Sequence, residues 1–70
     1  MQFTVEEVCA IARPWGIRNK SGNRHISRFF ATQQEAETFA QAMNEAWAKM
    51  ERKNLTKCIE SAIAALTPRA

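Results

Sequence analysis

The stretch that decides the fold is WGIRNKSGNRHISRFFATQQEA, residues 15–36, where two short strand-like runs flank a turn and a helix start follows. The runs are residues 15–18 and 24–31, and the turn sequence KSGN occupies residues 20–23. Its glycine and asparagine both tolerate a positive φ, which suits a tight reversal of the chain. The pattern therefore predicts a β-hairpin with a loop of about four residues.

Strand alternation divides the side chains of this hairpin between two faces. On the first strand it places Trp15 and Ile17 on one face and Arg18 on the other. On the returning strand, a mixed set shares one face: Arg24, Ile26, Arg28 and Phe30. That face is expected to be partly buried and partly solvated.

A helix is expected to begin directly after the hairpin. Thr32 followed by Glu35 forms a capping box, and acids in the first turn complement the helix dipole. Apolar residues then recur at three- and four-residue steps: Ala36, Phe39, Met43, Ala46 and Met50. This spacing predicts an amphipathic helix of about 20 residues whose stripe faces the core.

A second apolar stripe follows near the C-terminus. Its members are Leu55, Ile59, Ala62, Ile63 and Leu66. At 100° per residue this stripe is rotated by roughly 130° from the first, so one straight helix cannot turn both into one small core. Either the chain breaks near Asn54, a good N-cap, or a single long helix uses the second stripe to form a homo-oligomer.

The N-terminal segment is ambiguous over residues 4–12. Thr4 and Glu7 fit a capping box, which favours a short helix ending before Pro14. The β-branched side chains of this segment favour a strand instead, and the strand is the preferred interpretation.

These elements predict an α+β fold: a small antiparallel β-sheet of two or three strands, packed on a long amphipathic helix, with a further C-terminal helix. The 70 residues are expected to form a single small domain, with a basic strand and hairpin half over 1–31 and a helical half over 32–70. A hydrophobic fraction of 46% with only two Gly and two Pro indicates a folded chain. A domain of this size has little room for an enclosed substrate cavity as well as a core.

The two cysteines indicate a reducing compartment. Cys9 and Cys58 are far apart in sequence and form no CxxC pair, so both are expected to be small buried residues. No apolar run approaches the roughly 18 residues of a membrane span, and no signal peptide is recognisable after Met1. The expectation is a soluble cytoplasmic protein with no membrane partner.

Charge is distributed unevenly along the chain, which has a formal net charge of +3. No Asp or Glu occurs between Glu7 and Glu35, whereas acids and bases balance after Glu35. The candidate binding residues all fall in the acid-free window: Arg13, Trp15, Arg18, Lys20, Arg24, His25 and Arg28. The planar fork of Arg matches phosphate oxygens and the edge of guanine, and Trp15 and His25 could add stacking. The alternative is a solvated polar sheet face whose long stems cover apolar surface.

An enzyme is hard to build from this composition, and no catalytic residue is assigned. The chain has one His and neither Asp nor Tyr, so Cys9 would depend on His25 as its base. A zinc site would need Cys9, Cys58, His25 and a carboxylate, with none of the usual spacing. There is no glycine-rich phosphate loop. We expect no cofactor and no metal.

The pattern Trp15-x-Ile17-Arg18, then Gly22, then Phe30-x-Thr32-x-x-Glu35-Ala36-x-x-Phe39-Ala40 resembles the arm-type DNA-binding domain at the N-terminus of phage integrases, which is related to plant AP2 domains. The resemblance covers about residues 9–45. It implies three strands with basic residues, then a helix, with strand side chains entering the major groove. Those side chains would be Arg18, Arg24 and Arg28. No recombinase catalytic domain follows, and a further helical segment stands where the family has a linker, so DNA binding is implied but recombination is not.

The functional prediction is a small non-enzymatic nucleic-acid-binding module, for duplex DNA and encoded by a phage or mobile element. The alternative is a small inhibitor or adaptor of the anti-defence type. It would bind an acidic or nucleic-acid-handling host protein through the same basic hairpin.

Overall fold

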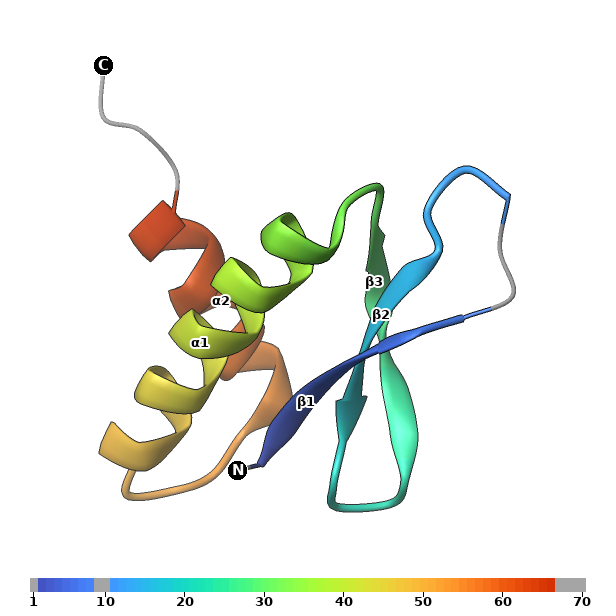
Figure 1. The fold of residues 1–70 in the computed structure, drawn as a ribbon. Helices are drawn as coiled ribbons and strands as arrows, with labels where there is room; N and C mark the ends of the chain where they lie inside the picture. Colours follow the sequence, from blue (N-terminus) through green and yellow to red (C-terminus); the bar gives the residue numbers. More distant parts are fainter. Residues whose placement is uncertain (1, 9–10, 67–70) are drawn as a thin grey trace.

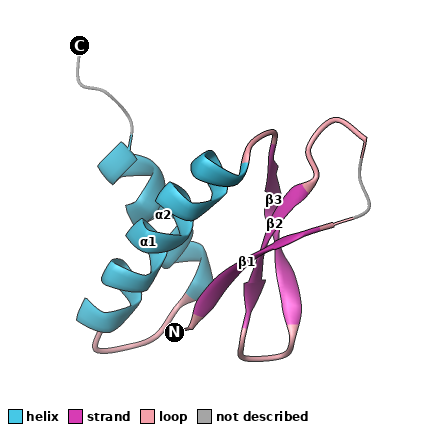
Figure 2. Ribbon diagram, viewed as in Figure 1, coloured by secondary structure: helices cyan, strands magenta, loops and turns pink. Residues whose placement is uncertain are grey.

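The computed structural model describes residues 2–8 and 11–66, and its three-stranded antiparallel sheet has both helices on one side (Figure 1). The elements in chain order are β1 (Phe3–Glu7), β2 (Trp15–Asn19), β3 (Arg24–Phe30), α1 (Gln33–Lys49) and α2 (Leu55–Leu66). The α+β architecture expected from the sequence is confirmed, and Figure 2 shows the separation of strands from helices. The strand order is β1-β2-β3, so β1 and β3 are the two edges.

The N-terminal segment forms a strand, so the preferred interpretation is confirmed over residues 3–7 and the helix suggested by Thr4 and Glu7 is wrong. β1 pairs with β2 along its whole length, from Phe3 opposite Asn19 to Glu7 opposite Trp15. This pairing satisfies backbone groups that a short isolated helix would leave exposed, and it suits β-branched side chains.

The hairpin and its four-residue turn are confirmed. Gly22 and Asn23 have φ of 84° and 53°, the left-handed values that the turn requires. The pairing is irregular where Gly16 lies opposite Phe29 and Arg18 lies opposite His25, because β3 there advances four residues while β2 advances two. An even number of extra residues preserves the alternation, so Ile26 and Phe30 both face the helices as expected.

The core lies between the sheet and the two helices. Its buried side chains come from all five elements: Phe3, Ile17, Ile26, Phe39, Ala40, Met43, Cys58 and Ala62. Phe3 meets Trp47 edge to face, with ring centroids 5.4 Å apart, and Phe30 meets Phe39 at 5.2 Å. The apolar stripe of α1 is therefore core, as its spacing predicted.

Asn44 of α1 binds the outer edge of β1. Its Nδ2 donates to the carbonyl oxygen of Phe3 at 3.0 Å, and its Oδ1 accepts from the amide of Phe3 at 2.9 Å. The amide side chain thus takes the place of a neighbouring strand at this position. This contact fixes α1 against the edge of the sheet.

The helical half breaks between Lys49 and Leu55, so the alternative of a break near Asn54 is confirmed and the single long helix is wrong. Thr32 caps α1 by accepting from the amide of Glu35 at 3.2 Å. After Lys49 the chain turns, and Asn54 Oδ1 accepts from the amide of Lys57 at 3.0 Å. α2 then runs back beside α1 (Figure 1), and neither described helix is long and apolar enough to cross a membrane.

Folding back brings the second stripe into the same core. Cys58 and Ala62 are fully buried, and Leu55, Ile59 and Ile63 are packed against the core while remaining partly exposed. Leu66 stays 42% exposed. The stripe is therefore used mainly within the chain, and a homo-oligomer through its exposed margin stays a prediction.

Removing the Asn54 cap should destabilise the domain. We expect Asn54→Ala to lower the free energy of unfolding by about 1 kcal/mol, because the amide of Lys57 loses its acceptor. Asn54→Asp keeps an acceptor at this position and should retain most of the stability. Urea denaturation followed by circular dichroism measures both, and equal midpoints for wild type and Asn54→Ala would contradict the assignment.

Candidate nucleic-acid interface

The sheet face that the helices leave uncovered carries a charged cluster centred on Glu6. Its carboxylate Oε1 accepts from Arg18 Nη2 at 2.6 Å and from Arg18 Nε at 3.0 Å. The Nε2 of His25 contacts the same oxygen. Arg18 Nη1 donates to Asn23 in the hairpin turn, at 2.7 Å to Oδ1 and 3.2 Å to the carbonyl oxygen. Arg18 therefore joins β1, β2 and the turn by hydrogen bonds within the protein.

These contacts favour the ionised form of Glu6. Hydrogen bonding from Arg18, followed by that from His25, holds the pKa of the Glu6 carboxyl below its ordinary value of 4.5. This carboxylate therefore balances the positive charge of Arg18, a residue from the stretch that contains no acids in the sequence. Glu6 was missed because it precedes the acid-free window, although alternation along β1 places it on the same face as Arg18.

Lys20 and Arg24 lie at the tip of the hairpin, which projects from the sheet in Figure 1. Both side chains are exposed. Among the described residues, the ion pairs are those of Glu6 with Arg18 and with His25, so neither tip cation has a carboxylate partner there. The tip is consequently a positively charged surface open to a partner.

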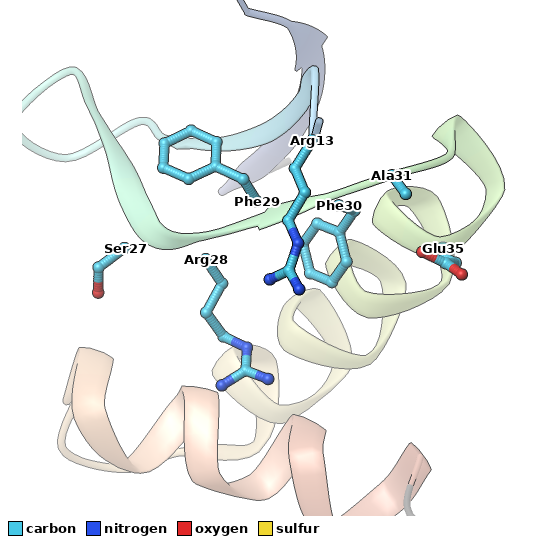
Figure 3. Close-up of a pocket in the computed structure, with 7 residues that line it drawn as sticks. All are labelled: Arg13, Ser27, Arg28, Phe29, Phe30, Ala31 and Glu35. Atoms are coloured by element: carbon cyan, nitrogen blue, oxygen red, sulfur yellow. The ribbon is translucent and has the colours of Figure 1, made fainter. Parts of the chain in front are cut away.

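Arg13 and Arg28 come together at the opposite end of β3. They line one pocket, Arg13 from the connection between β1 and β2 and Arg28 from β3 itself. Figure 3 shows the Arg13 guanidinium beside Phe30 and the Arg28 guanidinium farther from that ring, toward the helices. The guanidinium carbon of Arg28 lies 5.5 Å from the centre of the Phe39 ring, a cation–π contact that orients the side chain.

The two residues expected to stack are not on one surface. Trp15 is half-buried at the start of β2, and pairing places it opposite Phe30 on the face toward the helices. His25 lies on the uncovered face, where its ring is 6.1 Å from that of Phe29. Phe29 covers Gly16 so closely that a Cβ there would come within 3.1 Å of the ring. Phe29 is therefore the aromatic side chain beside His25, although it is not among the residues expected from the sequence to bind.

Cys58 is a core residue. Its Sγ donates to the carbonyl oxygen of Met43 at 3.1 Å, and burial raises the pKa of the thiol, which disfavours the nucleophilic thiolate. The core separates it from His25, which faces the other side of the sheet, and no three potential metal ligands cluster within the described residues. Cys9 lies outside the described residues, so the proposed Cys9–His25 pair stays a prediction.

No protein-family model matches the chain, and comparison with curated proteins and with solved structures gives no significant match. The resemblance to the arm-type domain of phage integrases accordingly stays a prediction from the sequence. What the chain does is inferred from the geometry and charges of the described residues.

Removing the charge of Glu6 should show how much the cluster around it contributes to the stability of the domain. Because the folded state lowers the pKa of this carboxyl, the stability it contributes is present at neutral pH and is lost as the pH falls below the ordinary value of 4.5 and through the folded value. Glu6→Gln should therefore melt at a lower temperature than wild type at pH 7, and the difference should shrink in acid. Thermal denaturation from pH 7 to pH 3 measures this, with Glu7→Gln on the same strand as the control. If the melting temperatures of wild type and Glu6→Gln differ by the same amount at all pH values, the ionisation of Glu6 does not contribute to stability in this way.

Proposed function

We propose that this chain is a small non-enzymatic nucleic-acid-binding module that contacts duplex DNA through a row of cations along β3. We call this row, Lys20, Arg24, Arg28 and Arg13, the basic edge. The observation that supports the proposal most strongly is that its members lie along one edge strand and its two ends, all exposed. None of them has a carboxylate partner among the residues described.

The spacing of the basic edge suits a phosphate backbone. Arg24 and Arg28 are four residues apart on β3, but β2 advances only two residues along the irregular stretch opposite, so their separation along the strand is between about 7 and 13 Å. Duplex DNA carries one phosphate per roughly 3.4 Å of axis on each strand, so cations at this separation can bind different phosphates. Exposed Arg and Lys side chains contribute affinity of this kind without requiring a base sequence.

Arg18 and His25 take a different part in this proposal. Both are engaged by Glu6, and a phosphate approaching the uncovered face would meet that carboxylate. We assign Arg18 to holding the hairpin in place, and the basic edge to binding. The groove-facing role that the integrase resemblance implies for Arg24 and Arg28 is compatible with this assignment, whereas for Arg18 it would require the ion pair to open.

The second candidate is a small inhibitor or adaptor that binds an acidic protein surface. The observation in its favour is Ile11, which is fully exposed in the connection that also carries Arg13. An exposed apolar side chain beside cations suits a protein interface, where a buried anchor supplies affinity and charges steer the encounter.

Binding of random duplex DNA at a series of salt concentrations tests the first proposal. Four phosphate contacts predict that log affinity falls with log salt with a slope of roughly −4. Lys20→Gln with Arg24→Gln should reduce the steepness of this slope by about 2, since each lost contact reduces it by about 1. The control pair Lys49→Gln with Lys57→Gln removes the same charge from the helices and should leave the slope nearly unchanged.

The wild-type result decides between the two candidates. Failure of wild-type protein to bind duplex DNA at low salt would eliminate the DNA-binding proposal and favour the protein inhibitor. A slope reduced equally by the hairpin pair and by the helix pair would instead place the contact elsewhere on the molecule.

A further inference from the structure

The pocket at the end of β3 places two cations of different origin in one space. It has a volume of about 650 Å³ and is lined by Arg13, Ser27, Arg28, Phe29, Phe30, Ala31 and Glu35. Arg13 and Arg28 are fifteen residues apart in sequence and reach the pocket from different segments (Figure 3). Their convergence is a property of the fold and is not apparent from the sequence.

The pair is not neutralised by a described side chain. Glu6, which compensates the charge of Arg18 and also contacts His25, lies on the uncovered face of the sheet. Glu35 lines the same pocket, but Figure 3 shows its carboxylate apart from both guanidinium groups, and it forms no ion pair with them. Two like charges that share a pocket repel each other, and an anion bound between them would relieve this repulsion.

The donors of the pocket suit a tetrahedral anion better than a planar one. Each guanidinium presents several N–H donors in a fixed plane, and a single such plane already satisfies both oxygens of a carboxylate. Two planes from separate segments can serve different oxygens of one phosphate group. Ser27 also lines the pocket, but Figure 3 shows its hydroxyl apart from both guanidinium groups. Phe30 supplies an apolar wall for a sugar or base.

We propose that Arg13 and Arg28 form a discrete phosphate-binding site, the anchor point of the basic edge. This inference rests on the proposed nucleic-acid function, because it names where the strand is held most tightly. The phosphate could be an internal phosphodiester or a terminal phosphomonoester, which share the chemistry that the site recognises. Arg24 lies on the same strand and the same face outside the pocket, so it is a matched control for Arg28.

Titration with inorganic phosphate tests the site without any nucleic acid. The side-chain Nε–Hε signals of Arg13 and Arg28 should shift in NMR spectra with one common, saturable dissociation constant, and that of Arg24 should shift only weakly and linearly. Arg28→Gln should weaken the saturable binding by roughly tenfold, the loss of one charge-assisted contact. Arg24→Gln should leave it unchanged, and Glu35→Gln should strengthen it by removing a nearby negative charge. Weak linear shifts of all arginines alike would overturn the proposal.

Two ligands then distinguish the sources of the phosphate. A dinucleotide with one internal phosphodiester and a nucleoside 5′-phosphate are titrated separately under the same conditions. Saturable shifts at Arg13 and Arg28 with either ligand support the site and identify the preferred form. Absence of saturable shifts with both overturns it.

Duplex DNA separates failure of this inference from failure of the proposed function. Arg13→Gln with Arg28→Gln removes the same charge as Lys20→Gln with Arg24→Gln, and it should weaken DNA binding about tenfold more. Equal losses would refute the anchor site while leaving the DNA-binding function intact. If the wild-type protein binds phosphate saturably but does not bind DNA, the DNA-binding function is refuted and the phosphate site is still supported. Circular dichroism of each variant confirms that the fold is retained.

Discussion

Glu6 supplies the contact on which the arrangement of charge in this domain depends. The helices cover one face of the sheet, so the other face has no core to hold the strands in register. On that face Glu6 links all three strands by side-chain contacts, because it binds Arg18 of β2 and His25 of β3 at one carboxylate oxygen. Arg18 continues the connection into the hairpin turn through Asn23. The cluster is partly exposed, so water weakens each of its contacts. The cluster contributes to the fold mainly because it joins several segments of the chain.

The same contact divides the cations into two classes. Arg18 directs its guanidinium donors at Glu6 and Asn23, which leaves few for a partner. The cations of the basic edge make no such ion pairs among the described residues, so their charge is available at the surface. Within the strand half of the chain, availability of donors is therefore what separates the basic edge from Arg18.

Local signals in the sequence predicted the elements well. The turn glycine and asparagine, the Thr32 cap and the Asn54 cap each act over a few residues, and all three are found where expected. The pairing of β1 and the irregular register opposite Gly16 depend on contacts between distant segments, which local patterns do not encode. The site was predicted less well for the same reason. Seven residues were grouped by their closeness in sequence, but alternation and pairing divide them between the uncovered face, the hairpin tip, the Arg13–Arg28 pocket and, for Trp15, the face toward the helices.

The convergence of Arg13 and Arg28 has an energetic consequence for a domain of this size. Arg13 and Arg28 are both exposed, so water and salt screen the repulsion between their guanidinium groups, and it costs the domain little. An anion that binds only the folded state stabilises that state by RT ln(1 + [L]/Kd), in addition to relieving the repulsion. On the proposal of an anchor site, the folded domain would therefore be more stable with an anion bound than without one. On this view the charges of Arg13 and Arg28 are offset only when an anion is bound, whereas Glu6 offsets the charge of Arg18 within the protein itself.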